Sequence, residues 1–519
     1  MINKIIDFSI NNKFIIGLLT LTIIGAGIWS ITKVPIDAVP DITNNQVQVI
    51  TQSPNLGTED IEQIITYPVE VAMSNLPNVE EIRSISRFGL SVVTIVFDDD
   101  MGTYLPRQLV AEKLNEVKEQ IPEGFGEPSM GPISTGLGEI YQYTLKVKPE
   151  FKDKYSISDL RTMQDWIVQR QMAMVDGVVE VNAIGGKIKQ YEVAVDPNDL
   201  KSIGLTIADV FEALEANNQN TGGAYIEKNH QANFIRGEGL VRSLEDIKKI
   251  TVKTVNNIPV TINDIAKVQF GAAIRYGALT QDGEGEVVGG LVMMLKGANS
   301  NDVIDNVKER MELIQESLPE GVVIEPLLDR SKLIGETTST VATNLTEGAL
   351  IVIFVLIFLL GNWRGGLIVA STIPLSLLFA FILMNVFDVW ANLMSLGAID
   401  FGIIVDGAVI IVETTVFLIA SQVLKKKKLS SKERDSIASS ASKKMMNAAF
   451  FGQLIILIVF LPILALQGIE GKMFKPMALT FIFAMIGAML LCLTYVPVSY
   501  THLTLPTMLA QCRSRWWRC

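Results

Sequence analysis

Six long apolar runs divide the 519-residue chain into a membrane part and a soluble part. A helix that spans a bilayer needs about 20 mostly apolar residues. Runs that reach or approach this length, with their polar flanks, lie near 14–31, 347–360, 367–387, 393–420, 448–466 and 477–498. We therefore expect one transmembrane helix in 1–33 and five more in 331–498, making a helical bundle interrupted by the soluble stretch 34–336.

The first run and the charges of the short loops bear on topology. Lys4 and Lys13 give the first run a basic flank, as in a signal peptide, but no small-residue cleavage site follows, so we expect a spanning helix. If all six helices span, these lysines, Arg364 and the run 425–428 fall on one side. Positive loops face the cytoplasm, so the soluble stretch is expected on the opposite side.

The soluble stretch alternates between two sequence periods. Runs with period 2, at 45–51 and 79–98, predict strands, and the apolar spacing of 57–76 and 103–121 predicts helices. Together they indicate one α+β unit at 34–132. A second set of such runs predicts strands at 141–148, 178–196, 286–297 and 322–329, and helices at 156–175, 206–218 and 302–318.

The second set of predicted strands and helices is interrupted by a segment rich in Gly and Asn after residue 218. We therefore divide the second unit into 133–183 and 275–330, separated by an insert at 184–274. The predicted fold class is a transmembrane helical bundle that carries an α+β domain of βαβ-type sandwich subdomains.

Composition narrows the possible chemistry. A formal net charge of −11, with no basic face in the soluble stretch, argues against a nucleic-acid partner. The three cysteines, Cys492, Cys512 and Cys519, lie outside 34–336, so no disulfide framework or cysteine zinc site is available there. With His230 and His502 as the two histidines, a His-built metal or catalytic site is nearly excluded.

The fourth apolar run contains three carboxylates, Asp400, Asp406 and Glu413. Each would cost roughly 2.5–3.5 kcal/mol at the bilayer centre, so they should face protein or a water-filled path. On one continuous helix, Asp406 and Glu413 share a face two turns apart, while Asp400 points about 120° away. The three would then form a ladder roughly 20 Å long.

Such a ladder suits a proton relay, because carboxylates held away from bulk water take up and release protons near neutral pH. Gly402, Gly407 and Ala408 would allow a neighbouring helix to approach closely. Two other interpretations are weaker. Structural pairing lacks a Lys or Arg inside the six runs. An intramembrane aspartyl protease needs two carboxyls at one shared site, and Asp400 and Asp406 diverge.

Three motifs resemble the heavy-metal branch of the resistance–nodulation–division efflux pumps. They are DFGIIVDGAVIIVE (400–413), VPIDAVPDIT (34–43) and GNWRGG (361–366), and the resemblance covers about residues 1–498. It implies a multi-pass pump, not an enzyme, in the inner membrane of a Gram-negative cell with a large periplasmic domain. The soluble units would be porter subdomains, and the insert part of a docking domain.

The resemblance also implies a mechanism and partners. Asp400, Asp406 and Glu413 would be the proton relay of an antiporter for divalent metal cations, without a cofactor or catalytic residues. The pump would be a homotrimer joined to a periplasmic adaptor (a membrane fusion protein) and an outer-membrane channel. Copper and silver pumps of this branch replace the first Asp and place methionines where this chain has Ile404 and Ile411. The pattern therefore favours zinc, cobalt, cadmium or nickel.

The chain departs from the family in length. The family is about twice as long, and residues 499–519 do not resemble what should follow, so we expect a truncated pump ending in an anomalous tail. An inactive fragment or scaffold, and a pump for organic compounds, stay open as alternatives. The metal ligands are not identifiable, since no acidic or Met cluster stands out in 34–336.

Overall fold

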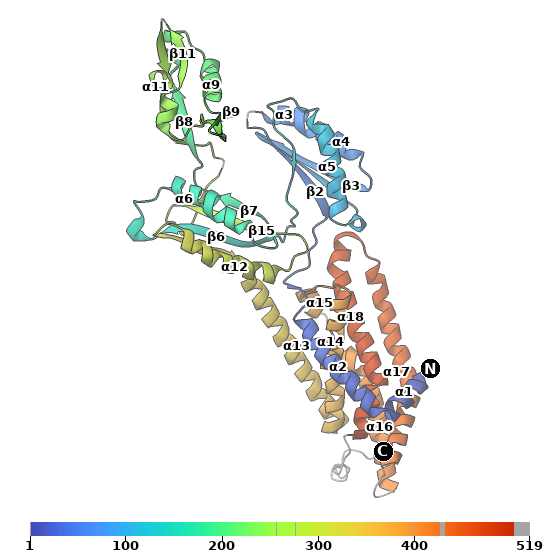
Figure 1. Cartoon of the computed structure of the whole chain (residues 1–519). Coiled ribbons are helices and arrows are strands. Elements are labelled where there is room, and N and C mark those ends of the chain that lie inside the picture. The colour runs from blue at the N-terminus through green and yellow to red at the C-terminus, as the bar shows by residue number, and fades with distance from the viewer. Residues whose placement is uncertain are drawn as a thin grey trace. The chain divides into compact units, whose positions relative to one another are not determined.

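The computed structural model describes residues 2–54, 56–255, 257–275, 277–397, 399–425 and 431–502. The chain forms two compact units (Figure 1). The first unit combines Met1–Ile140, Met293–Asp305 and Asp329–Cys519, and the second combines Tyr141–Val292 and Asn306–Leu328.

Within the described residues, six helical stretches of the first unit are long and apolar enough to cross a membrane, as the sequence predicts. They are Lys13–Ile31 (α2), Arg330–Leu360 (α13), Trp363–Val386 (α14), Leu393–Ile419, Asp435–Leu464 and Gly468–Leu493 (α18). The fifth belongs to α17 (Ser431–Leu464). Helix α14 is central, since it packs against α2, α13, α16 (Phe401–Lys425) and α18 (Figure 1).

Several helices extend beyond their apolar runs. Helix α13 begins at Arg330 and α17 at Ser431, both well before their apolar runs begin near 347 and 448. Each residue added to an existing helix gains one backbone hydrogen bond, so helices continue through polar sequence. Hydropathy locates only the part that suits the bilayer.

A short amphipathic helix, α1 (Ile2–Asn11), precedes the first spanning helix and was not predicted. It packs against α17, where Asp7 pairs with Lys443 at 2.5 Å. The hydrogen bond from Lys443 lowers the pKa of the Asp7 carboxyl. Lys13, at the start of α2, pairs with Asp435 of α17 at 2.8 Å. The N-terminal lysines and the start of α17 therefore share one end of the bundle, as the orientation prediction requires.

The first unit also contains a four-stranded antiparallel sheet, ordered β3-β4-β2-β5. Its strands are Val79–Arg87 (β3), Leu90–Phe97 (β4), Asn45–Gln52 (β2) and Ser129–Met130 (β5). Alternate residues such as Val47, Val49 and Ile95 are buried beneath helices α3 (Thr58–Ile61), α4 (Tyr67–Ser74) and α5 (Tyr104–Lys118). The predicted strands 45–51 and 79–98 and both predicted helices are confirmed, although a π-helical turn, Glu62–Thr66, joins α3 to α4.

The second unit is built on the sheet β14-β15-β6-β16, with β7 also paired to β15. These strands are Leu279–Thr280 (β14), Glu286–Met294 (β15), Glu139–Val147 (β6), Val322–Asp329 (β16) and Val178–Ile184 (β7). Tyr143 of β6 is fully buried, and its hydroxyl donates to Oε1 of Gln164 at 3.0 Å. Burial raises the pKa of the Tyr143 phenol, so this group acts as a neutral core donor.

The strands between 189 and 272 pair among themselves, in the part of the chain that the structure describes. The pairs are β8 (Lys189–Val195) with β13 (Ala266–Ala272), β9 (Thr221–Lys228) with β10 (Gln231–Gly237), and β11 (Thr251–Val255) with β12 (Ile258–Thr261). Leu200, Leu205, Val210, Ile262 and Ile265 belong to a separate apolar cluster in this segment. The segment thus has its own small core; the exact subdomain boundaries stay predictions.

A buried ion pair lies where several connections of the first unit meet. Asp37 and Arg330 are separated by 2.8 Å, and their side chains are only 9% and 8% exposed. Arg330 also donates to the main-chain oxygen of Leu137, and the hydroxyl of Ser300 donates to Asp37 at 3.2 Å. The pair therefore joins the segment after α2 to the first residue of α13, and both carboxylate oxygens of Asp37 accept hydrogen bonds.

Candidate functional site

The acidic segment is not one continuous helix. Helix α15 (Leu393–Gly397) ends before Asp400, and α16 (Phe401–Lys425) begins after it. The Asp400 carboxylate accepts a hydrogen bond from the main-chain nitrogen of Gly402 at 2.8 Å. An aspartate that accepts such a bond caps the start of a helix. The predicted three-carboxylate ladder along one helix is therefore wrong for Asp400, which lies in the break.

Asp406 and Glu413 lie on α16, seven residues apart, so they share one face at a spacing of about 10 Å along the axis. Both are exposed on the surface of the chain, and so is Asp400. No ion pair or hydrogen bond to Asp406 or Glu413 comes from the side chains that the structure describes. Two carboxylates thus project from an apolar helix on a face that the described residues leave exposed.

The opposite face of α16 packs into the bundle. Ile404, Ala408 and Val412 are fully buried, and α16 contacts α14, α17 and α18. Gly407 is also buried, and a Cβ atom there would lie only 2.6 Å from Nε2 of Gln453 on α17. Gly402 differs, because an added Cβ would meet only the Asp400 carboxylate within 4 Å. Close helix approach on α16 therefore falls at Gly407 and Ala408.

Gln453 is a residue that the sequence analysis missed. It is a single polar side chain in the apolar run 449–460, and it is 2% exposed. An isolated amide within a spanning segment was the signal that could have marked it, since polar side chains in such segments face protein. Its position against Gly407 places it one residue along α16 from Asp406.

Among the described residues, no group of three or more His, Cys, Asp or Glu side chains is arranged to hold a metal ion. His230, one of the two histidines, lies at the exposed turn between β9 and β10.

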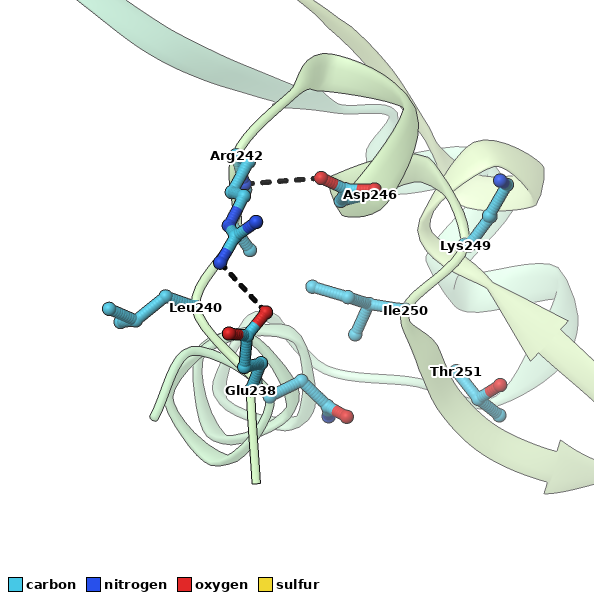
Figure 2. Close-up of a pocket in the computed structure, with 10 residues that line it drawn as sticks. Glu238, Leu240, Arg242, Asp246, Lys249, Ile250 and Thr251 are labelled. Atoms are coloured by element: carbon cyan, nitrogen blue, oxygen red, sulfur yellow. Dashed lines mark hydrogen bonds and ion pairs between the residues drawn. The ribbon is translucent and has the colours of Figure 1, made fainter. Parts of the chain in front are cut away.

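A pocket of about 490 Å³ opens in the second unit (Figure 2). Its wall includes Glu238 and Arg242, which form an ion pair at 2.9 Å, and the main-chain nitrogen of Arg242 donates to Asp246 at 3.1 Å. Asp246 also belongs to the capping box that begins α10 (Leu244–Lys248) with Ser243. Two of the charged groups are paired with each other and a third caps a helix, so this pocket offers no evident chemistry for transport.

The capping box at Ser243 gives a pH-dependent prediction. Hydrogen bonds from Ser243 lower the pKa of Asp246 below its ordinary value of 3.8. A carboxyl whose pKa is lower in the folded state stabilises the fold above the unfolded pKa, and this contribution is lost as the pH falls through the folded pKa. Amide hydrogen exchange in 244–248 should therefore accelerate below about pH 4, beyond the intrinsic change with pH.

The matched variants for this test are Asp246→Asn and Glu245→Gln. Asp246→Asn should raise exchange in 244–248 already at pH 6 and remove the extra acceleration below pH 4. Glu245→Gln, which changes an exposed carboxyl one residue away, should leave the wild-type profile. Identical profiles for Asp246→Asn and wild type would contradict the capping role.

The helical bundle, the acidic helix and the α+β units together make the architecture that the resemblance to the resistance–nodulation–division family implies. Over residues 5–515, the chain belongs to the AcrB/AcrD/AcrF family. This match includes most of 499–519, of which 503–519 lie outside the described residues. The resemblance inferred from 34–43, 361–366 and 400–413 is therefore confirmed.

Similar proteins have names that refer to metals. The chain is 47% identical over 504 residues to the cobalt-zinc-cadmium resistance protein CzcA of Cupriavidus metallidurans, covering 96% of this chain and 47% of that protein. It is 39% identical over 526 residues to the nickel and cobalt resistance protein CnrA of the same organism, covering 96% and 49%. It is 36% identical over 505 residues to the cation efflux system protein CusA of Escherichia coli, covering 96% and 48%.

A crystal structure of a heavy metal efflux pump matches the fold with a TM-score of 0.84 and 35% identity, covering 95% of this chain and 48% of that one. The predicted fold class is confirmed at the level of this pump fold. The chain spans about half the length of the curated relatives it matches.

Proposed function

We propose that this chain forms part of a proton-driven pump that exports divalent metal cations. The observation that carries the proposal is the exposure of Asp406 and Glu413 on one face of an otherwise apolar helix, without partners among the described residues. Charges on such a face must meet protein or water inside a membrane, and carboxylates there serve proton transfer. Asp400, at the break before α16, is the third member of this relay.

The proposed substrates are zinc, cobalt, cadmium or nickel. The chain is 47% identical to the cobalt-zinc-cadmium resistance protein and 36% identical to CusA. The higher identity supports zinc, cobalt, cadmium or nickel as substrates. Ile404 and Ile411 flank the relay carboxylates with hydrocarbon, where thioethers would favour Cu(I). The transported ion and the protons are substrates, and the proposal needs no resident cofactor.

The experiment is a tolerance panel in a Gram-negative host whose own metal pumps have been deleted. The protein is expressed from its complete open reading frame, together with the adaptor and channel genes of its own genome. Growth should improve with zinc, cobalt, cadmium or nickel and stay at the control level with copper, silver and organic dyes. Tolerance to dyes alone would favour a pump for organic compounds, and no gain with any compound would contradict transport.

We further assign the side that carries 425–428 and Lys13 to the cytoplasm and the soluble units to the periplasm of an inner-membrane protein. The ion pair between Lys13 and Asp435 supports a shared side for these basic regions. On the periplasmic side, the pump would meet a membrane fusion adaptor and an outer-membrane channel, as its family implies.

The proposed homotrimer is supported by the β9–β10 hairpin. Every residue of β9 is exposed, and Tyr225, Ile226, Phe234 and Ile235 expose between 48% and 83% of their surface. A two-stranded hairpin is marginal alone in water, and clustered exposed apolar residues mark contact surfaces. We assign this hairpin to the contact between copies of the pump.

Phe234→Asp is expected to weaken the trimer, because it places a charge among the apolar residues of this hairpin. Native mass spectrometry of the purified protein should then show mainly monomers. Asn233→Asp adds the same charge at the adjacent position and should leave the trimer fraction close to wild type. A trimer that withstands Phe234→Asp would exclude the hairpin as the principal contact.

A further inference from the structure

Gln453 is buried in the bundle without a hydrogen-bond partner. The side chain is 2% exposed, and neither Nε2 nor Oε1 has a partner among the described residues. A buried amide that makes no hydrogen bond destabilises a protein, because nothing compensates for the loss of its bonds to water. A polar group that is retained at such a cost calls for a specific explanation.

The amide lies directly on the backbone of α16. An ideal Cβ atom at Gly407 would be 2.6 Å from Nε2 and 3.1 Å from Oε1 of Gln453. The Gln453 amide therefore occupies the space that any other residue at position 407 would fill. Asp406 precedes Gly407 directly, and it is the only polar side chain in 401–412.

A packing role does not account for this amide. Polar side chains hold transmembrane helices together by bonding across the interface, and Gln453 makes no such bond within the described residues. An apolar side chain of similar shape would pack here without the cost of an unpaired amide. We therefore expect the hydrogen-bond partner of Gln453 to be a side chain that can rotate toward it.

The chemistry of an amide suits a partner that changes its protonation state. The amide nitrogen donates to a carboxylate, and the amide oxygen accepts from a protonated carboxyl group. A leucine or methionine can do neither. The three atoms nearest to an added Cβ at Gly407, the residue after Asp406, all belong to the Gln453 amide.

We infer that Gln453 is a positioning residue for Asp406: its amide bonds the Asp406 carboxyl when that group turns toward α17, in both protonation states. The inference rests on the proposed function, in which Asp406 carries protons. It adds a residue on a second helix that holds the carrier while its charge changes. Gly407 takes part because its missing side chain leaves room for the amide.

The elements that contact α16 also carry titratable groups. Cys492 of α18 interacts electrostatically with Asp406. Tyr495 of α19 (Tyr495–His502) shares a hydrogen bond with Ser371 of α14 at 2.9 Å. Glu347 of α13 precedes Gly348, where an added Cβ atom would lie 3.3 Å from the ring of Phe401, next to Asp400. On α17, the nearest charged residue to Gln453 in sequence is Lys444, nine positions away.

The test measures the protonation of Asp406 without requiring transport. A hydrophobic carbodiimide reacts with protonated carboxyl groups in membranes, and mass spectrometry gives the modified fraction of the 399–425 segment at each pH. The protein is expressed from its complete open reading frame in native membranes. Asp406→Asn identifies the signal that belongs to Asp406.

Gln453→Leu should move the pH of half-maximal labelling upward by about 1 unit. A hydrogen bond to a charged acceptor is stronger than one to a neutral group, so losing the amide disfavours the carboxylate more than the acid. Gln453→Asn, which keeps the amide, should recover part of the shift. Ser442→Ala is the matched control, since Ser442 is also a buried, unpartnered polar residue of α17, eleven positions away.

A merely structural amide would give a different result. Gln453→Leu would then leave the labelling profile unchanged, which overturns the inference; if this variant fails to fold, Gln453→Met takes its place. The outcome is separable from the proposed function. If Asp406→Asn abolishes metal export while Gln453→Leu leaves labelling unchanged, the relay stands and the role of Gln453 fails. A shifted profile in a protein that exports no metal supports Gln453 and contradicts the pump.

Discussion

Asp406→Asn is expected to reduce metal export to the level of cells that lack the protein. Asparagine is nearly the same size as aspartate but cannot take up a proton, so the step that couples the proton gradient to transport is lost. The membrane potential supplies about 2.3 kcal/mol per charge per 100 mV. A pump that has no group to carry protons cannot use this free energy. We expect loss of coupling without loss of folding, because Asp406 is exposed and makes no contact that the described part of the chain depends on.

The measurement is zinc tolerance together with zinc content of the cells, with protein abundance in the membrane checked by immunoblot. The matched control is Asp388→Asn, because Asp388 is an exposed residue in a turn with φ of 53°, a conformation that asparagine also adopts readily. The control should export zinc like the wild type. Full zinc tolerance in Asp406→Asn, at normal abundance, would remove Asp406 from the relay.

Arg330→Ala should destabilise the first unit by about 3–5 kcal/mol, the usual effect of removing one partner from a buried ion pair. Asp37 would keep its charge at 9% exposure, with the hydroxyl of Ser300 as its remaining side-chain donor. The cost comes from this uncompensated charge and not from the lost attraction alone. Thermal unfolding of the purified protein in detergent, followed by tryptophan fluorescence, should show a clear fall in the midpoint temperature.

Two further variants separate this cause from general damage. Glu116→Ala breaks the exposed pair between Lys113 and Glu116 in the same unit, which should change stability by less than about 1 kcal/mol. The double variant Asp37→Leu with Arg330→Met removes both charges and should recover much of the loss, because an apolar pair needs no solvation. If the double variant is as unstable as Arg330→Ala, the uncompensated charge is not the reason.

Local patterns in the sequence were enough to predict most elements. The strands at 45–51 and 79–98 follow from strict alternation, because one face of that sheet packs under α4 and α5. The apolar runs located the six candidate spanning helices found within the described residues. Helix α1 escaped because its apolar face, with Ile6 and Ile10, is too short to stand out from the adjoining run.

The site was predicted less completely than the fold. Three carboxylates in an apolar run point to the right segment, but hydropathy does not register where a helix stops, so the break before Asp400 was missed. Contacts between distant segments are also invisible in a single sequence. Asp37 and Arg330 are 293 positions apart, and the position of Gln453 against Gly407 depends on how α16 and α17 pack.

The most direct measurement is made in everted membrane vesicles, where export by the cell becomes uptake into the vesicle. A dye reports the pH of an acidified lumen while zinc is added outside. Our account predicts that zinc entry makes the lumen less acidic as protons leave through the Asp406 relay, and that Asp406→Asn abolishes both signals. Zinc accumulation with no change in the pH of the lumen, or the same exchange in Asp406→Asn, would contradict proton-driven export.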